Sequence, residues 1–145
     1  MQTAIRVVLL VAVALVVAAC SRPPALTEEK LEPASVEHIE GSEVSRVVLT
    51  ERAAQRLGIE TAPVTQSTNK GAARLAVPYG AVLYDADGAT WAYTSPQPLT
   101  FVRHPITIET IQGDVALLTE GPPAGTQVVT VGVAELFGTE FQVGH

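Results

Sequence analysis

The sequence predicts a mostly β protein: a small antiparallel β-barrel with one short helix, preceded by a signal peptide and a disordered tether. Short segments rich in β-branched and aromatic residues recur from residue 75 onward, with turn sequences between them. One helical pattern stands ahead of them, and an apolar run without charge lies near the N-terminus. Strands and turns at such regular spacing are typical of a barrel or sandwich, and about 100 residues suffice for one such core.

Residues 1–19 have the pattern of a signal peptide. Arg6 precedes the apolar run Val7–Ala19, which is too short to span a membrane. The run ends at Cys20, the only cysteine of the chain. The segment Val17–Cys20 resembles the lipobox of bacterial lipoproteins, whose leader is removed before an acylated cysteine. The resemblance implies lipid attachment at Cys20 and a lipid-anchored protein of the cell envelope, on the periplasmic side of a membrane. The alternative is an ordinary secreted protein with one spare thiol.

Residues 20–43 are expected to form the acylated cysteine and a flexible acidic tether. The stretch contains Pro23, Pro24 and Pro33 among scattered apolar residues and many glutamates. Such a composition buries too little apolar surface to offset the entropy of ordering the chain. The folded domain is therefore expected over residues 44–145.

The domain is expected to begin with a strand, a helix and a second strand. The first strand is Arg46–Leu49. Thr50 is then suited to cap a helix over Glu51–Leu57, because its hydroxyl can accept a hydrogen bond from the first helical turn. Gly58 stands where a glycine commonly ends a helix, and Ile59–Val64 is the next strand.

Seven further strands are expected after this point. They cover Leu75–Val77, Ala81–Tyr84, Thr90–Thr94, Leu99–Val102, Ile106–Ile111, Val115–Thr119 and Gln127–Val131. Asp87-Gly88 and Ser95-Pro96 are two of the turn sequences between them. Pro105 interrupts what would be one long strand and predicts an edge or a bulge. Trp91 and Tyr93 alternate with small residues and predict one buried aromatic face.

Composition and motifs argue against catalysis and against nucleic-acid binding. The formal net charge is -6, whereas nucleic-acid binding needs a basic face. The three histidines, His38, His104 and His145, share no spacing typical of metal ligands. The loop that starts at Asp85 lacks the later calcium ligands of an EF-hand, so a hairpin turn is preferred. No nucleophile elbow and no phosphate-binding glycine loop occurs. The protein is expected not to be an enzyme and to bind no metal or cofactor.

Most of the chain after the tether resembles the periplasmic adaptor subunits of RND-type efflux pumps, the membrane fusion proteins. The matching segments are Val48–Val64, Val77–Asp85, Gly88–Tyr93, Phe101–Ile106, Gly121–Val129 and Gly132–Leu136. In that family these parts belong to the membrane-proximal domain, a small β-barrel built from the two ends of the chain. Two features depart from the family: Pro122-Pro123, and the short separation of the two matching parts by Thr65–Leu75 alone.

The resemblance implies a membrane-proximal-like domain without the helical hairpin, the lipoyl-like domain or the middle barrel. Such a chain is expected to act as an accessory or truncated adaptor that supports transmembrane transport through protein contact. Its partners would be an inner-membrane efflux transporter or a full-length adaptor, with the membrane reached through the lipid anchor. One alternative is a free-standing envelope lipoprotein that serves as a binding module without a transport role. Another is a remnant that folds without a function.

The last segment, Glu135–His145, places Leu136, Phe137 and Phe141 near the chain end. The simpler interpretation is that these side chains pack the last strand over the core. The functional interpretation is that Phe141 contacts the partner, because aromatic side chains dominate many interfaces.

Overall fold

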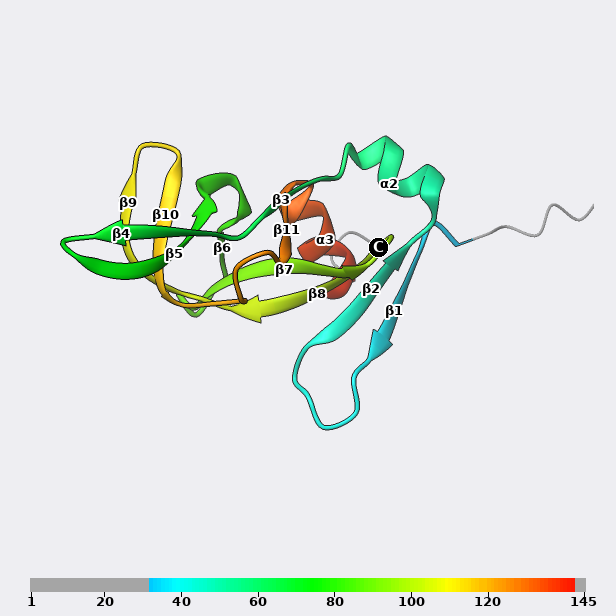
Figure 1. The fold of residues 1–145 in the computed structure, drawn as a ribbon. Coiled ribbons are helices and arrows are strands. Elements are labelled where there is room, and N and C mark those ends of the chain that lie inside the picture. The colour runs from blue at the N-terminus through cyan, green and yellow to red at the C-terminus, as the bar shows by residue number, and fades with distance from the viewer. Residues whose placement is uncertain (1–31, 143–145) are drawn as a thin grey trace, which may run out of the picture. The chain divides into compact units, whose positions relative to one another are not determined.

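The computed structural model describes residues 32–142 (Figure 1). The predicted signal peptide, the predicted lipid attachment residue Cys20, the first part of the predicted tether (residues 21–31) and residues 143–145 lie outside this range. The elements are β1 (Ala34–His38), β2 (Ser45–Leu49), α2 (Glu51–Leu57), β3 (Glu60–Pro63), β4 (Thr65–Asn69), β5 (Ala72–Pro78), the 3₁₀ turn η1 (Tyr79–Ala81), β6 (Leu83–Tyr84), β7 (Thr90–Gln97), β8 (Thr100–Pro105), β9 (Thr107–Gln112), β10 (Val115–Glu120), β11 (Gln127–Val131) and α3 (Val133–Glu140).

The strands form two antiparallel sheets, so the fold is mostly β as expected. The larger sheet has the order β1-β2-β8-β7-β11-β3, with β6 beside β7. The smaller sheet has the order β4-β5-β10-β9. Neither order returns to its first strand. The closed barrel that the sequence predicted is therefore not found among residues 32–142.

Two bent segments join the sheets at opposite corners. The chain passes from β3 to β4 at Val64, whose N–H donates to the Thr126 carbonyl at 2.8 Å. It passes from β8 to β9 at Ile106, whose N–H donates to the Thr90 carbonyl at 3.0 Å. Pro63 and Pro105 precede these corners and have no N–H for a strand ladder. The interruption expected at Pro105 is thus present, as a corner between sheets.

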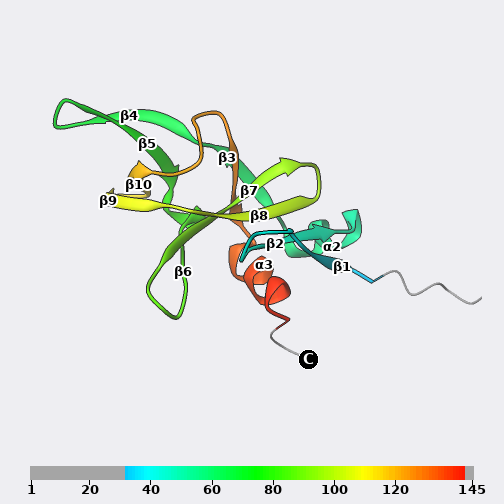
Figure 2. The ribbon, with the colours of Figure 1, turned by 90° about the horizontal axis from the view of Figure 1, so that it is seen from below.

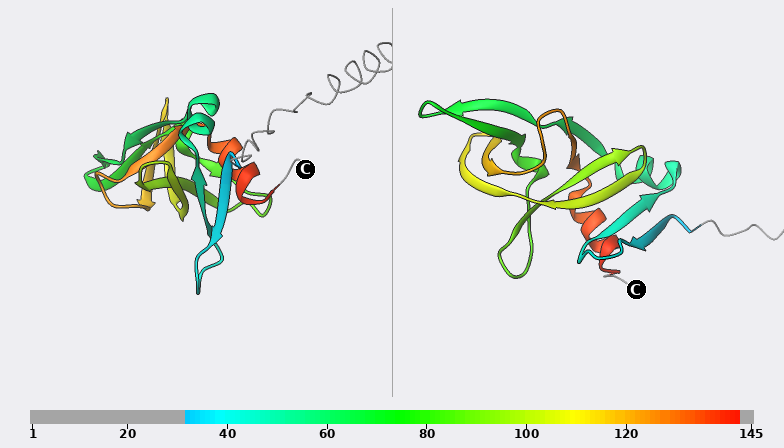
Figure 3. Two further views of the ribbon diagram at one scale, coloured as in Figure 1. Left: turned by 90° about the vertical axis from the view of Figure 1, so that its right-hand side faces the viewer. Right: turned by 60° about the horizontal axis from the view of Figure 1, so that its bottom comes forward.

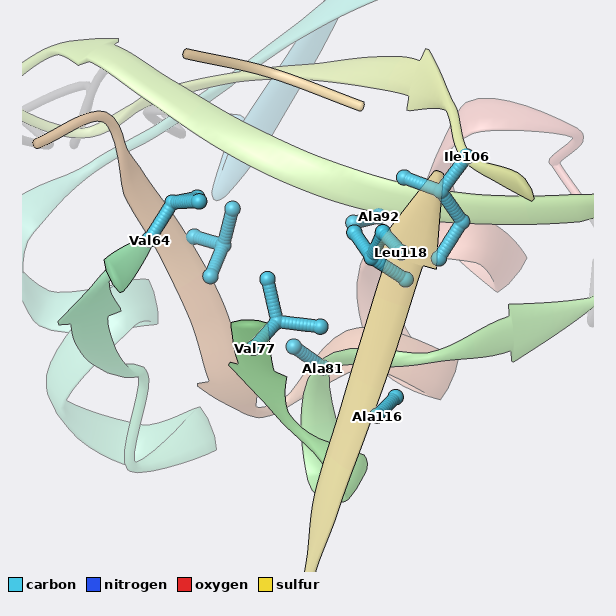
Figure 4. Close-up of a cluster of buried hydrophobic side chains, with 8 residues drawn as sticks. Val64, Val77, Ala81, Ala92, Ile106, Ala116 and Leu118 are labelled. Carbon is cyan, nitrogen blue, oxygen red and sulfur yellow. The ribbon is translucent and has the colours of Figure 1, made fainter. Parts of the chain in front are cut away.

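The first hydrophobic core fills the space between the two sheets. Figure 4 shows its members: Val64, Val77, Ala81, Ala92, Ile106, Ala116, Leu118 and Val128. Val64 and Ile106 lie at the two corners, so both bends are held by apolar burial. Each buried aliphatic side chain of this size contributes about 1.5–3 kcal/mol.

The second core covers the other face of the larger sheet. It contains Val47, Leu49, Tyr93, Phe101, Val129, Val133 and Leu136, with side chains of α2 packed at its margin. Figures 2 and 3 show α2 and α3 beside β1 and β2, away from the β4–β5 and β9–β10 hairpins. Ala92 belongs to the first core and Tyr93 to the second, so the sheet is buried on both faces. Of the two residues expected to form a buried aromatic face, Tyr93 is fully buried and Trp91 is only half-buried.

The helix α2 is confirmed with its predicted bounds. Thr50 Oγ1 accepts a hydrogen bond from the Ala53 N–H at 3.2 Å, and Gly58 adopts the left-handed conformation at φ 63°. Arg52 and Arg56 of this helix are exposed.

Four elements differ from the expectations. Residues 34–38, assigned to the tether, form β1, which pairs with β2 because Ala34 and Val36 alternate with polar residues. Residues 65–69, read as a connection, form β4. The turn expected at Ser95-Pro96 lies inside β7 as an irregularity of its register. The last segment contains a helix, α3, where a strand was expected.

Candidate contact surface around Arg103

A buried ion pair fixes the C-terminal helix to the larger sheet. Arg103 comes from β8 and Glu140 is the last residue of α3. Arg103 Nε donates to Glu140 Oε2 at 2.8 Å, and the side chains are only 7% and 3% exposed. Because a charge in a low-dielectric interior is costly without a partner, each group depends on the other.

Glu140 also binds two further strands. The Tyr93 hydroxyl of β7 donates to Glu140 Oε2 at 2.5 Å, and the Ser45 N–H of β2 donates to Oε1 at 3.2 Å. Burial, and next the hydrogen bond to Glu140, raise the pKa of Tyr93, so this phenol stays protonated as a donor. One carboxylate therefore connects α3 with three strands of the sheet.

Aromatic rings surround the Arg103 guanidinium. Its central carbon lies 4.4 Å from the ring centroid of Trp91, 4.9 Å from that of Phe141 and 5.9 Å from that of Phe137. The two phenylalanine rings lie 4.7 Å apart. A cation over aromatic faces is attracted by the ring quadrupoles. We refer to Trp91, Arg103, Phe137, Glu140 and Phe141 as the Arg103 cluster.

Trp91 is held in place by the turn after β6. Its Nε1 donates to Asp85 Oδ2 at 2.8 Å, while Asp85 Oδ1 accepts from the N–H groups of Asp87 and Ala89. These hydrogen bonds, that of Trp91 foremost, lower the pKa of Asp85. The predicted hairpin turn at Asp87-Gly88 is confirmed, with the Asp85 carboxylate as its internal acceptor.

The Arg103 cluster is built for rigidity, with one exposed aromatic side chain at its border. Phe141 is 50% exposed, although its ring packs on Phe137. No buried side-chain nitrogen or oxygen within residues 32–142 lacks a hydrogen-bond partner. Over the same range, no group of three His, Cys, Asp or Glu side chains could hold a metal ion. The geometry offers a contact surface, with its polar groups already engaged in structural bonds.

The structure separates the three apolar residues of the last segment. Leu136 is fully buried, Phe137 is half-buried and Phe141 is half-exposed. The expected last strand is a helix because Val133, Leu136 and Phe137 recur at helical spacing, which brings them to one face.

The sequence analysis missed Arg103, Glu140 and Tyr93 as a connected group. Glu140 follows Val133 and Leu136 at helical spacing, so it falls on the same buried face of the helix. A carboxylate on a buried face needs a partner, and this pattern could have predicted one. Arg103 follows apolar residues in a predicted strand, and a charge at such a position likewise indicates a buried partner.

The chain is not matched by any family model, any curated protein or any solved structure. Within the described part of the chain, neither helix is long and apolar enough to cross a membrane.

Proposed function

We propose that this protein is a lipid-anchored accessory adaptor of an RND-type efflux system, which acts through protein contact at the membrane. Its support begins with the sequence: the lipobox-like segment that ends at Cys20, and the adaptor-like segments on both sides of residues 65–75. The observation that carries the proposal is the pairing of those segments in one sheet. β2 pairs with β8 and β3 pairs with β11, so the two parts build a single domain.

The two corners support the finer description of the domain as a small barrel. At Val64 and Ile106 the chain passes from a strand of the larger sheet to a strand of the smaller sheet, and both sheets pack on one shared apolar core. A barrel flattened at two bent strands would have this arrangement, because corners are made by strands that change sheets. The membrane-proximal domain of the adaptors is expected to be such a barrel.

Phe141 is the candidate partner contact of this function. Half of its surface is exposed, and its ring packs on Phe137 and on the Arg103 guanidinium. An aromatic side chain held by such contacts loses little conformational entropy on binding, which favours its use as an anchor.

A photo-crosslinking residue at position 141, in cells, tests the proposal directly. We expect capture of an inner-membrane transporter or a full-length adaptor, identified by mass spectrometry. Phe141→Ala should lower the yield of a crosslinker placed at the neighbouring exposed Gln142, while the melting temperature changes by only a few degrees. A loss of stability without a captured partner would assign Phe141 to packing. Capture of neither protein from positions 141 and 142 would favour the free-standing envelope module.

A further inference from the structure

The strand β1 stands at one end of the larger sheet and has an open edge. It pairs with β2 on one side, and the order of the sheet begins with it. In Figure 1 the β1–β2 hairpin projects from the rest of the fold. Within residues 32–142 no strand lies beside the outer edge of β1. Such an edge presents a row of main-chain donors and acceptors to another strand.

The register of β1 shows which of its main-chain groups point outward. The Thr50 N–H donates to the Pro33 carbonyl at 3.0 Å, so these two opposed residues form a hydrogen-bonded pair. Because hydrogen-bonded pairs alternate along an antiparallel ladder, the next residues of β1 that bond to β2 are Ser35 and Glu37. The main-chain groups that point away from β2 are those of Ala34, Val36 and His38.

The strands at the other ends of the two sheets are less suited to pairing. β3 ends at Pro63, which has no N–H to donate. β9 follows the corner at Pro105, and its register with β10 is irregular. β4 has no apolar side chain that a neighbouring strand could bury. In contrast, β1 contains no proline, lysine or register shift, so it lacks the features that protect sheet edges.

The side chains of β1 are complementary to a second copy of the same strand in antiparallel orientation. A pair centred on Val36 would place each outward-pointing residue of one copy opposite an outward-pointing residue of the other. Ser35 of each copy would then lie opposite Glu37 of the other, where a hydroxyl can donate to a carboxylate. Ala34 would lie opposite His38, so that a small side chain faces a large one.

The two neighbouring registers are less favourable. A pair centred on Glu37 would place two carboxylates directly opposite each other, which destabilises a sheet. A pair centred on Ser35 would leave His38 beyond the end of the partner strand. In the register centred on Val36 the two Glu37 carboxylates are only diagonal neighbours, and each keeps its ion pair with Arg46 at 3.2 Å. Charge therefore favours one register of self-pairing.

We propose that β1 binds a second copy of this chain by antiparallel pairing centred on Val36, which joins the two larger sheets into one. The two copies are related by a twofold axis, the commonest symmetry of homo-oligomers. Because a contact of one short strand buries little area, the dimer is in equilibrium with the monomer. This surface goes beyond the proposed function, because its position and its occupant are deduced without Phe141, the lipid anchor or an efflux component.

Disulfide formation between full-length chains in cells tests the proposal and its register. Val36→Cys should give a disulfide-linked dimer on a non-reducing gel, because the Cα atoms of this pair would lie about 5.5 Å apart. Ser35→Cys alone and Glu37→Cys alone should give at least about fivefold less dimer, because each lies about 7–8 Å from its own copy. Two differently tagged chains, one with Ser35→Cys and one with Glu37→Cys, should crosslink to each other. The parent measures any linkage through Cys20.

A charge at position 35 gives an independent test that leaves the main-chain groups in place. Ser35→Glu would face Glu37 of the other copy and should lower the yield of the Val36→Cys crosslink about threefold to tenfold. Ser35→Lys would face the same carboxylate and should raise the yield about twofold. Gln66→Glu adds the same charge to the exposed end strand β4, so it is the matched control and should not change the yield. Melting curves of every variant show whether it is folded.

Three results would overturn the proposal: no dimer from a folded Val36→Cys, equal or greater yields from Ser35→Cys or Glu37→Cys alone, and equal losses in Ser35→Glu and Ser35→Lys. A photo-crosslinking residue at position 35, with mass spectrometry of the linked peptides, tests other occupants of the edge. Predominant linkage to residues 21–31 within one chain, or to a different protein, would also overturn the proposal. None of these results decides whether Phe141 contacts an efflux component, so the two proposals fail separately.

Discussion

At the scale of single residues, Glu140 connects more of the molecule than any other described side chain. It accepts hydrogen bonds from Arg103, Tyr93 and the Ser45 N–H. Its position at the C-terminal end of α3 is unfavourable for a carboxylate, because the helix dipole is negative there. Arg103 offsets this effect as well as the cost of burial.

Removing Glu140 should leave Arg103 buried without its counter-charge. We expect Glu140→Ala to lower the free energy of unfolding by about 3–5 kcal/mol, measured by urea denaturation. Glu135→Gln, an exposed carboxylate of the same helix, is the control and should change it by less than about 0.5 kcal/mol. Replacing both partners by methionine should recover much of the loss, since a well-packed apolar pair avoids the desolvation cost. The explanation would be contradicted if Glu140→Ala were as stable as the parent while the variant with methionine at both 103 and 140 were strongly destabilised.

Gly132 is a second residue whose identity follows from the structure. It is the N-cap residue before α3, at φ 91°, and a Cβ there would lie 2.2 Å from Ile59 Cδ1. Gly132→Ala therefore adds a steric clash to backbone strain, and we expect a loss of about 2–3 kcal/mol. Gly58→Ala, at φ 63° with open space around it, isolates the strain and should cost about 1 kcal/mol. Thermal denaturation measures both variants. If Gly132→Ala and Gly58→Ala lose the same free energy of unfolding, the Ile59 side chain moves aside and the clash costs nothing.

At the scale of elements, an ion pair ties β9 to the β4–β5 hairpin. Arg74 of β5 makes two hydrogen bonds of 2.7 Å to the Glu109 carboxylate of β9, and Asn69 of β4 donates to it at 2.9 Å. The hydrogen bond from Arg74, and next that from Asn69, lower the pKa of Glu109 to about 2. The same pair raises the pKa of Arg74.

The lowered pKa of Glu109 predicts a pH dependence of stability. The folded-state pKa lies below the ordinary value of 4.5, so the contribution is present above that value and is lost as the pH falls toward 2. Glu109→Gln should therefore be less stable than the parent at neutral pH, and the difference should shrink between pH 4.5 and 2. Urea denaturation at several pH values measures this, with Glu43→Gln as the control. A difference that is constant with pH would assign the effect to packing alone.

Elements with local signals could be predicted from the sequence, and those that depend on tertiary contacts could not. The helix α2 carries its own caps, Thr50 and Gly58, so its bounds were correct. The strand β4 is polar and depends on pairing with β5, which no local pattern reveals. In α3 the helical spacing was present, but the preceding run of strands favoured one more strand. The ion pair of Arg103 and Glu140 joins residues 37 positions apart, and single-sequence patterns do not specify such pairs.

At the scale of the whole molecule, the folded domain and the predicted lipid anchor are separate parts. The domain described over residues 32–142 begins with Pro33, whose carbonyl accepts from the Thr50 N–H at 3.0 Å. Cys20 precedes this point by 13 positions in the sequence. Cys20 therefore lies outside the part of the chain that the structure describes.

Replacing the predicted lipid attachment site should change the location and leave the fold intact. We expect Cys20→Ser to abolish incorporation of a labelled fatty acid and to release the protein from the membrane fraction, or to leave its leader uncleaved. The melting temperature of the domain should stay within a degree or two of the parent, because the side chains of the two described cores come from residues 34–137. Acyl label that persists in Cys20→Ser would refute the lipoprotein prediction.

The pairing of early strands with late ones sets the order in which the chain can fold. Val47 of β2 pairs with Phe101, and Thr61 of β3 pairs with Val129. During synthesis, β2 and β3 therefore emerge long before their partners exist, and neither can complete its sheet. Such long-range pairing slows folding toward milliseconds to seconds. A nascent chain of this topology cannot complete its larger sheet until β11, close to the end of the described residues, has been synthesised.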